Sequence, residues 1–510
     1  MTDRAPGFHT LAIHAGAAPD AATGARATPI YQTTSFVFDD VDHAASLFGL
    51  QAFGNIYTRI GNPTNAVLEE RVAALEGGTA ALAVASGHAA EFLCFHALMQ
   101  PGDEFVAAKK LYGGSINQFN HSYKNFGWNV IWADSDDLEA FAAAVTPKTK
   151  AIFIESIANP GGVIVDIAGI SKIARKHNIP LIVDNTMATP YLIRPFEHGA
   201  DIVVHSLTKF LGGHGNSIGG IIVDGGSFNW VGDDRYPMLS KPRPEYNGMV
   251  LGETFGNFAF AIATRVLGLR DMGPALSPFN AFMILTGIET LPLRMQRHCE
   301  SALAVATHLA KHPAVEWVSY PGLPGDRYHD LAKHYSPKGA GAVFTFGLKG
   351  GYDAGVKLVT ELKLFSHLAN IGDGLDDASP AQRRAEDGVR RRPAGDPPVD
   401  RTGRRAGPDR RSGSGAGLSA VFPGRRVATN PEPTTGRAPL RERFTRKTST
   451  IAHPVVGSGF TPAACPGMTA RFTPARRPRC ASHAPRPSPA RGSRAPGGQA
   501  RPRAARPAAA

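Results

Sequence analysis

Short apolar stretches alternate with amphipathic stretches between about residues 79 and 224. The apolar stretches are short and rich in branched side chains, which is typical of buried strands. We expect seven strands, at 81–85, 104–107, 130–133, 151–155, 181–184, 202–205 and 220–223. Helices are expected between most of them, at 89–99, 115–126, 138–145, 167–177 and 193–198. This alternation predicts a mostly parallel seven-stranded sheet covered by helices on both faces, an α/β fold.

The regions on either side of this alternating part have other patterns. Residues 1–65 show little periodicity, so we expect an irregular arm, and Thr64 or Asn65 is expected to cap a helix at 66–75. Residues 225–275 are rich in Gly, Pro and aromatic residues and are expected to cross the mouth of the site. A smaller α+β unit should follow, with two strands between helical segments, at 279–312, 315–318, 342–346 and 353–364.

Composition changes abruptly after Asp373. Residues 374–510 contain 26 arginines, one lysine and nine acidic residues, a net charge of +18, whereas residues 1–373 carry −6. The net charge of +12 for the whole chain therefore averages two unlike pieces. The tail is also rich in Pro, Ala and Gly, and such a segment buries too little apolar surface to offset its ordering entropy. We expect residues 374–510 to be disordered.

The cysteine pattern and the hydropathy of the chain indicate in which cellular compartment the protein is expected. Four cysteines, at 94, 299, 465 and 480, show no CxxC spacing, which fits a reducing cytoplasm and gives no reason to expect a metal site. Residues 1–30 lack the continuous apolar stretch of a signal peptide. No apolar run approaches the roughly 18–20 residues of a membrane helix. We therefore expect a cytoplasmic protein without a membrane partner.

Polar residues follow two of the expected strands. One strand ends at Asp184, and the next along the chain is followed by Ser206, Thr208 and Lys209. Taken singly, an aspartate after a strand is usually a cap and a lysine is usually solvated. Ligands of open α/β sheets gather outside the carboxyl ends of the strands. The combination suits pyridoxal phosphate (PLP), because lysine can form a Schiff base and aspartate can hold the pyridinium nitrogen protonated.

Six motifs resemble the Cys/Met-metabolism PLP enzymes of the cystathionine γ-synthase family, over roughly residues 8–373. They are Tyr57-Thr-Arg-Ile-Gly-Asn-Pro-Thr64, Ser86-Gly-His-Ala-Ala90, Leu111-Tyr-Gly-Gly114, Glu155-Ser-Ile-Ala-Asn-Pro160, Val183-Asp-Asn-Thr186 and His205-Ser-Leu-Thr-Lys209. Two further stretches are similar to the O-acetylhomoserine sulfhydrylase branch, Arg265-Val-Leu-Gly-Leu-Arg-Asp271 and Gly287-Ile-Glu-Thr-Leu-Pro-Leu-Arg294.

The resemblance implies a PLP-dependent transferase fold of type I, like that of aspartate aminotransferase. Residues 1–65 would be an arm that serves the neighbouring subunit. Residues 66–265 would form the PLP-binding large domain, and residues 266–373 an incomplete small domain ahead of the disordered tail at 374–510. A homo-oligomer is implied, a tetramer assembled as a dimer of dimers.

The resemblance also assigns residues to the cofactor. Lys209 would form the Schiff base, Asp184 would pair with the pyridine nitrogen, and Tyr112 would stack on the ring and assist proton transfer. Asn159 is expected near the 3-oxygen of PLP. Asn370 is expected to hold the substrate carboxylate.

The cofactor phosphate is expected to bind where a helix begins. The backbone of Gly87 and His88 and the hydroxyls of Ser206 and Thr208 are implied as its ligands. Physically, a glycine permits close approach of the backbone, and a helix N-terminus offers N–H groups and a positive dipole end to an anion. Two further residues, Tyr57 and Arg59, would complete the phosphate site from the neighbouring subunit, with Tyr57 also reaching the substrate.

The implied activity is γ-replacement on O-acetyl-L-homoserine with sulfide or a thiol, giving homocysteine or methionine and acetate, in methionine and cysteine biosynthesis. Two alternatives share Lys209, Asp184 and Tyr112, namely cystathionine γ-synthase and a γ-lyase of the methionine γ-lyase type. They differ in thiol acceptor and leaving group.

The sequence departs from the family pattern past Asp373. The family continues there with an arginine that grips the substrate α-carboxylate in bidentate fashion, and no such ending follows here. The tail resembles a GC-rich reading frame translated out of register, so an inactive frameshifted product is an alternative. Binding of nucleic acid through the 26 arginines is another, although no recognised nucleic-acid-binding fold accompanies them.

Overall fold

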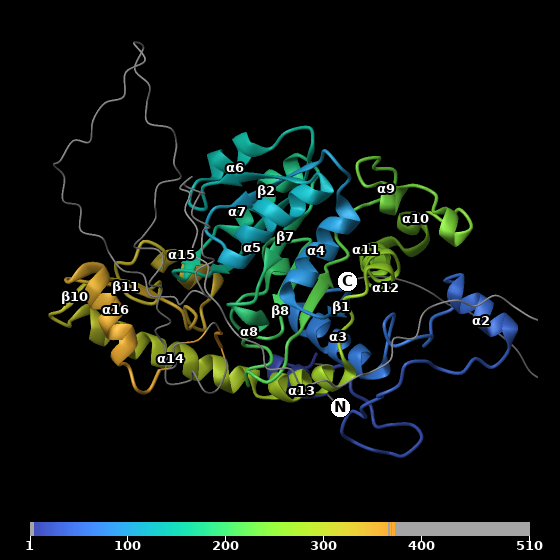
Figure 1. Ribbon diagram of the computed structural model, residues 1–510, viewed down its shortest axis with the longest axis horizontal. Helices are drawn as coiled ribbons and strands as arrows, with labels where there is room; N and C mark the ends of the chain where they lie inside the picture. Colours follow the sequence, from blue (N-terminus) through green and yellow to red (C-terminus); the bar gives the residue numbers. More distant parts are fainter. Residues whose placement is uncertain (1–4, 366–367, 369, 373–510) are drawn as a thin grey trace, which may run out of the picture. The chain divides into compact units, whose positions relative to one another are not determined.

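A seven-stranded sheet forms the centre of the structure, a computed structural model that describes residues 5–365, 368 and 370–372 (Figure 1). The tail expected at 374–510 lies outside the described residues. The strands are β1 (Ala80–Val84), β2 (Glu104–Ala108), β3 (Asn129–Ala133), β4 (Thr149–Glu155), β7 (Leu181–Asp184), β8 (Ile202–Ser206) and β9 (Gly220–Asp224). All seven predicted strands are confirmed, each within two residues of its expected bounds.

The strand order is β1-β9-β8-β7-β4-β2-β3. The five strands from β8 to β3 pair in parallel, while β9 runs antiparallel to both β8 and β1. Every residue of β4 is buried. A strand covered on both faces needs apolar side chains in both directions, which explains the continuous apolar runs in the sequence.

Helices follow most strands and cover the sheet (Figure 1). The main ones are α3 (Pro63–Glu76), α4 (Gly87–Leu98), α5 (Gly113–Asn117), α6 (Leu138–Ala144), α7 (Ile167–Lys176) and α8 (Thr189–Leu192). The helix expected at 115–126 consists of α5, a π-helix and a 3-10 helix in succession. The one expected at 193–198 is a 3-10 helix at Pro195–His198.

The start of α3 differs from the prediction. Asn62, rather than Thr64 or Asn65, is the capping residue, and its side chain accepts a 2.9 Å hydrogen bond from the backbone N–H of Thr64. Pro63 occupies the first turn, where a missing N–H carries no cost. At the other end, Gly77 has a φ of +83° and ends the helix in the left-handed conformation that glycine favours.

The expectation of a wholly irregular N-terminal arm is wrong for two segments. The arm contains α1 (Phe8–His14) and α2 (Val41–Phe48). Asp40 caps α2 by accepting a 2.7 Å hydrogen bond from the N–H of His43. Both helices span about two turns, which is too short for a period of 3.6 residues to be recognised reliably.

Residues 225–275 are more helical and more buried than their composition suggested. They contain α9 (Pro237–Ser240), α10 (Leu251–Phe255), α11 (Ala259–Ala263), a π-helix at Thr264–Leu269 and α12 (Arg270–Met272). Phe260 of α11 is fully buried, and α11 packs against β1 and β9. This segment therefore completes the core beside the edge of the sheet.

The smaller unit has the expected helices and strands. It consists of α13 (Pro278–Glu289), α14 (Leu291–Ala310), β10 (Val315–Ser319), α15 (His329–Tyr335), β11 (Thr345–Leu348) and α16 (Gly351–Glu361). β10 and β11 pair antiparallel, and β11 begins three residues later than predicted. A separate two-stranded ribbon joins β5 (Ile157–Ala158) and β6 (Val163–Ile164). The domain boundaries at 65/66 and 265/266 stay predictions.

Candidate active site

The carboxyl ends of three neighbouring parallel strands bring polar residues to one edge of the sheet. β4 ends at Glu155, β7 at Asp184 and β8 at Ser206. Glu155 and Asp184 are paired positions in the register, and β7 pairs in turn with β8. The two strands that the sequence singled out are therefore adjacent, and Lys209 follows the second of them directly.

Asp184 is a partly buried residue at the end of β7. Its Oδ1 accepts a 2.8 Å hydrogen bond from the backbone N–H of Thr186. Burial raises the pKa of Asp184, while the Thr186 hydrogen bond and the nearby His205 and His88 act in the opposite direction. A carboxylate in this environment gains from an adjacent cation. A protonated pyridine nitrogen would supply that charge, so Asp184 fits PLP.

Lys209 lies in a turn held by backbone hydrogen bonds. The N–H of Gly213 donates to the carbonyl of Lys209 over 2.8 Å, and the N–H of Gly212 donates to Leu207 over 2.9 Å. The Lys209 amine donates a 2.7 Å hydrogen bond to Oδ1 of Asn370. The structure thus brings together the lysine and the amide that the sequence had assigned to cofactor and substrate.

The expected phosphate site lies where α4 begins. Ser86 caps this helix, and its hydroxyl accepts a hydrogen bond of 3.2 Å from the N–H of Ala89. A Cβ on Gly87 would lie 2.9 Å from the Cβ of Ser206, so only glycine permits this close approach. The N–H groups of a first helical turn point out of the helix and favour an anion.

The hydroxyls assigned to the phosphate differ in their surroundings. The backbone N–H of Ser206 is fixed by a 2.8 Å hydrogen bond to Oγ1 of Thr186. The hydroxyl of Thr208 both donates to and accepts from the backbone of Gly219, over 3.2 and 3.1 Å. Thr208 therefore contributes to the loop geometry as well as being a candidate phosphate ligand.

Tyr112 and His88 place two rings beside this helix start. Their centroids are 5.8 Å apart with an interplanar angle of 38°. A Cβ on Gly114 would lie 2.4 Å from the Tyr112 ring and 2.8 Å from the His88 ring, so a glycine is required there. The Tyr112 side chain remains 44% exposed, which leaves it able to contact a ligand.

Among the residues assigned to the cofactor, two have a buried polar atom without a hydrogen-bonding partner in the described part of the chain. These atoms are Nε2 of His88 and Oδ1 of Asn159. Buried polar groups are normally paired, so such atoms indicate a polar ligand or water. Together with the acid, the lysine and the helix start, they fit PLP.

Sequence reasoning missed Glu155. Its Oε1 accepts the backbone N–H of Tyr112 over 2.5 Å, and its Oε2 accepts that of Asn159 over 2.7 Å. The available signal was its position at a strand end inside a recognised motif.

A buried pair, of which His205 interacts electrostatically with Asp184, was also missed. Nε2 of His205 lies 2.6 Å from Oε1 of Glu76, and both side chains are fully buried. Asn185 donates a 2.8 Å hydrogen bond to the same oxygen. Glu76 ends α3, 129 residues before His205, and no local pattern could connect the two.

Arg294 was quoted only as part of a motif, yet it holds the turn after Lys209. Its guanidinium donates to the carbonyls of Phe210 and Gly287 over 2.7 and 2.8 Å, and its Nε donates to Thr290. Gly213 makes room for it, because a Cβ there would lie 2.1 Å from Nη1 of Arg294.

Within the described part of the chain, Tyr57 and Arg59 form no hydrogen bond, ion pair or ring contact with the other residues assigned to the cofactor. The Arg59 guanidinium lies 5.4 Å from the centre of the Tyr57 ring and donates to the backbone carbonyl of Arg270. The Tyr57 side chain is 41% exposed. Their assignment to a neighbouring subunit's site stays a prediction.

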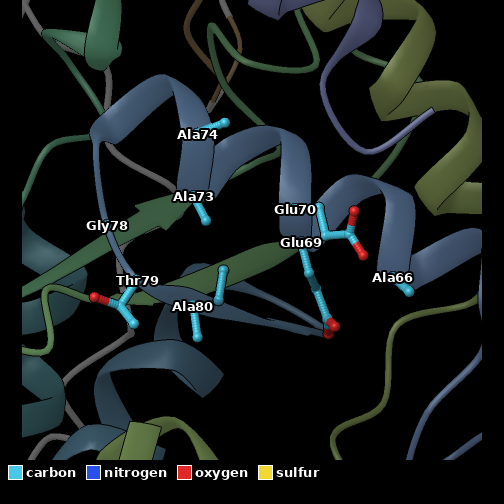
Figure 2. A pocket seen from close by; sticks show the side chains of 9 residues that line it. Ala66, Glu69, Glu70, Ala73, Ala74, Gly78, Thr79 and Ala80 are labelled. Carbon is cyan, nitrogen blue, oxygen red and sulfur yellow. The ribbon is translucent and has the colours of Figure 1, made fainter. Parts of the chain in front are cut away.

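A cavity of about 360 Å³ lies elsewhere, between α3 and the start of β1 (Figure 2). Figure 2 shows Glu69 and Glu70 extending from α3 on the right of the view, with Thr79 and Ala80 on the left. The described lining is otherwise alanine and glycine and holds no lysine or arginine. Glu69 is paired with Arg265, Glu70 adds a negative charge, and the described lining offers a phosphate no cation, so this cavity is unsuited to PLP.

Known proteins match most of the described chain. The family model described as Cys/Met metabolism PLP-dependent enzyme matches residues 9–375. O-acetyl-L-homoserine sulfhydrylase of Leptospira meyeri is 54% identical over 373 residues, which cover 71% of this chain and 84% of that protein. Homocysteine synthase of Schizosaccharomyces pombe is 50% identical over 368 residues, covering 72% and 86%.

A solved structure from Campylobacter jejuni, described as an O-acetylhomoserine (thiol)-lyase, superposes with a TM-score of 0.71. It is 40% identical in sequence, and the match covers 72% of this chain and 92% of that one. That structure carries N'-pyridoxyl-lysine-5'-monophosphate at one position.

Proposed function

Because the chain belongs to the family of Cys/Met metabolism PLP-dependent enzymes, we propose that it catalyses γ-replacement on O-acetyl-L-homoserine. Sulfide or a thiol replaces the acetoxy group, giving L-homocysteine or methionine and acetate. PLP is the cofactor. The observation that carries the proposal is the position of Asp184 at the end of β7 and of Lys209 just after the adjacent parallel strand β8, in a chain 54% identical to an O-acetyl-L-homoserine sulfhydrylase.

Lys209, Asp184 and Tyr112 have the central roles in this proposal. When bound, PLP supplies an electron sink for the substrate carbon that loses its proton. Lys209 would hold the cofactor covalently, and its free amine would move protons at the substrate carbons. Asp184 keeps the pyridine nitrogen protonated. Tyr112 covers the ring face and assists the proton transfers.

The remaining assigned residues bind and orient. The phosphate is held by the backbone of Gly87 and His88 and by the hydroxyls of Ser206 and Thr208. Asn159 lies near the 3-oxygen of the cofactor. Its unpartnered Oδ1 supports a ligand at that point. Asn370 binds the substrate carboxylate, and its hydrogen bond to Lys209 places it beside the reacting amine.

A homo-oligomer, a tetramer assembled as a dimer of dimers, is part of the proposal. The N-terminal arm exposes large apolar side chains, with Val37 95%, Phe53 75% and Phe48 54% exposed. Several large apolar side chains exposed on one segment favour a surface that a partner covers. We propose that the arm packs on a second copy, where Tyr57 and Arg59 reach that copy's phosphate and Tyr57 its substrate.

The proposed reaction belongs to methionine and cysteine biosynthesis. No helix in the described part of the chain is long and apolar enough to cross a membrane. We propose a cytoplasmic location, which the free thiols of Cys94 and Cys299 support because a reducing compartment preserves them.

The test is an acceptor assay on the purified full chain with PLP. O-acetylhomoserine is offered with sulfide, with cysteine or alone, and acetate and the amino-acid products are measured. Homocysteine with sulfide supports the proposal. A thioether formed preferentially with cysteine would favour cystathionine γ-synthase, and release of ammonia and a 2-oxo acid without thiol would favour a γ-lyase.

Lys209→Ala is the control for this assay. It should lose both turnover and the covalent fixation of PLP by borohydride. Fixation that persists in Lys209→Ala would refute the assignment of the lysine. A chain that binds PLP but turns over none of these substrates would favour the inactive product. A DNA affinity that falls steeply with salt and vanishes without residues 374–510 would favour the nucleic-acid alternative.

A further inference from the structure

One buried carboxylate connects two of the residues assigned to the cofactor. Glu155 is 3% exposed and ends β4. Its two oxygens accept from different backbone groups, Oε1 from the N–H of Tyr112 over 2.5 Å and Oε2 from that of Asn159 over 2.7 Å. These residues lie on opposite sides of Glu155 in the sequence. The carboxylate therefore links the segment that follows β2 to the segment that follows β4.

The chemistry of this contact requires a carboxylate. An ionised carboxyl group only accepts hydrogen bonds, and each oxygen here faces a donor. The 2.7 Å distance to the N–H of Asn159 is in the range expected for a hydrogen bond to a charged acceptor. A glutamine would present its own NH₂ group to one of the two N–H groups, so one of these hydrogen bonds would be lost.

The turn that carries Tyr112 is held at a second point by another buried acid. The hydroxyl of Ser115 donates a 2.7 Å hydrogen bond to Oε1 of Glu91 on α4. Burial, and then the negative charges of Asp184 and Glu155, raise the pKa of Glu91 well above its usual range. The turn is therefore joined to α4 through Ser115 as well as to the end of β4 through Tyr112.

We propose that Glu155 is a positioning residue, which fixes Tyr112 and Asn159 relative to each other and to its register partner Asp184. It acts through the backbone. In this way Tyr112 at the ring face, Asn159 at the 3-oxygen and Asp184 at the pyridine nitrogen are positioned to contact the same cofactor. The inference rests on the proposed function, because it assumes those three roles.

The test uses the full chain loaded with PLP and the variant Glu155→Gln. We expect kcat for O-acetylhomoserine and sulfide to fall by about 10-fold to 100-fold, the cost of a small misplacement of reacting groups, with little change in KM. The visible circular dichroism of bound PLP should also change, because the Tyr112 ring moves relative to the cofactor. Glu139→Gln, an exposed glutamate on α6, is the matched control and should change neither quantity.

A double-mutant cycle separates positioning from a general structural effect. In a Tyr112→Ala, Asn159→Ala background, Glu155→Gln should lower kcat by less than about twofold, since the groups it positions are gone. An equal loss in both backgrounds would overturn the proposal. So would an unchanged kcat and dichroism in the single variant.

Glu155→Asp keeps the carboxylate, and it serves as a second variant in case Glu155→Gln does not fold. It is expected to bind PLP and to show an intermediate loss of kcat. If both Glu155 variants fail to fold and bind PLP, the residue is structural and the proposal is wrong. If the parent chain proves to have no turnover, the proposed function fails, while the dichroism change still decides the role of Glu155.

Discussion

The amine of Lys209 and the side-chain oxygen of Asn370 are hydrogen-bonded over 2.7 Å, although 161 residues separate them in the sequence. Lys209 follows β8 in the large sheet, and Asn370 lies near the end of the described chain. The contact therefore ties the smaller unit to the proposed catalytic amine. It also places an amide where a substrate carboxylate would be close to that amine.

Asn370→Ala should weaken substrate binding more than cofactor binding. A hydrogen bond to a charged group contributes about 1.5–3 kcal/mol, so KM for O-acetylhomoserine should rise by roughly 10-fold to 100-fold. PLP affinity should stay unchanged, because the proposed cofactor ligands lie elsewhere. Steady-state kinetics and PLP titration check this. The exposed Asn229→Ala is the control, and a parallel loss of PLP from Asn370→Ala would contradict the assignment.

Asp184→Asn should leave the stability of the PLP-free protein unchanged or raised, while it weakens PLP binding. Burial raises the pKa of Asp184 above its ordinary 3.8, so the folded chain holds this proton more tightly than the unfolded chain. Its contribution to stability is fully present below 3.8 and is lost as pH rises through the raised pKa. At neutral pH the PLP-free Asp184→Asn variant should therefore unfold at or above the temperature of the PLP-free parent.

The same substitution, Asp184→Asn, should weaken PLP binding. Loss of the anion beside the pyridine nitrogen should weaken PLP binding by about 2–5 kcal/mol, as for truncation of a buried charge pair. Thermal unfolding with and without PLP, at pH 5 and pH 8, measures both effects. A PLP-free variant clearly less stable than its parent at pH 8 would show that the Asp184 charge is already compensated.

Arg294→Lys should loosen the turn that carries Lys209. The guanidinium joins the carbonyls of Phe210 and Gly287, and a lysine has one nitrogen with which to replace this fork. The loss should destabilise the protein by about 1.5–3 kcal/mol and slow covalent attachment of PLP. Chemical unfolding and the rate of PLP attachment test this, with the exposed Arg297→Lys on the same helix as control. An unchanged attachment rate would show that Arg294 contributes to stability and not to the placement of Lys209.

The sheet and the central pair were predictable from local patterns. The strand ending in Asp184 and the strand before Lys209 are short apolar runs in an alternating chain, and neighbouring parallel strands bring such residues to one edge. The phosphate turn was predictable because Gly87 follows a strand and opens a helix. In each case a single stretch of sequence contains both the pattern of the strand or helix and the residue with the functional side chain or backbone.

The supporting contacts were not predictable in this way. Glu76 and His205 are hydrogen-bonded across 129 residues, and the pairing depends on how α3 packs against the sheet. The double acceptor role of Glu155 depends on where two backbone N–H groups meet. In addition, α1 and α2 are too short for their periodicity to be recognised. Tertiary packing decides these features, and a local pattern does not record it.

Arg59 and Lys209 should complement each other between subunits. If Arg59 serves the partner's phosphate, Arg59→Ala and Lys209→Ala chains are each inactive, yet a mixed dimer contains one site with both residues intact. Each mixed dimer should show up to about half of the turnover of a parent dimer, so an equimolar random mixture should recover up to about a quarter. The assay is kinetics after unfolding and refolding the mixed chains, with Arg59→Ala refolded alone as control. Hybrids that form but recover no activity would contradict a shared site.

Residues 374–510 should limit substrate use without affecting the cofactor. The assigned cofactor residues all lie at or before Lys209, and the family model matches the chain only as far as residue 375. The tail contains no counterpart of the family ending whose arginine binds the substrate carboxylate. A bidentate charged pair of this kind is worth about 2–5 kcal/mol of substrate and transition-state binding.

Replacing residues 374–510 with the ending of a sulfhydrylase relative should therefore raise kcat/KM for O-acetylhomoserine by roughly 30-fold to several thousand-fold. PLP affinity should stay within about threefold of the parent, because that ending supplies none of the proposed cofactor ligands. A repaired chain whose new carboxylate-binding arginine is changed to alanine is the control, and it should lose most of the gain. If the parent chain already turns over as fast as the repaired one, the tail supplies a substrate-binding group that its sequence does not reveal.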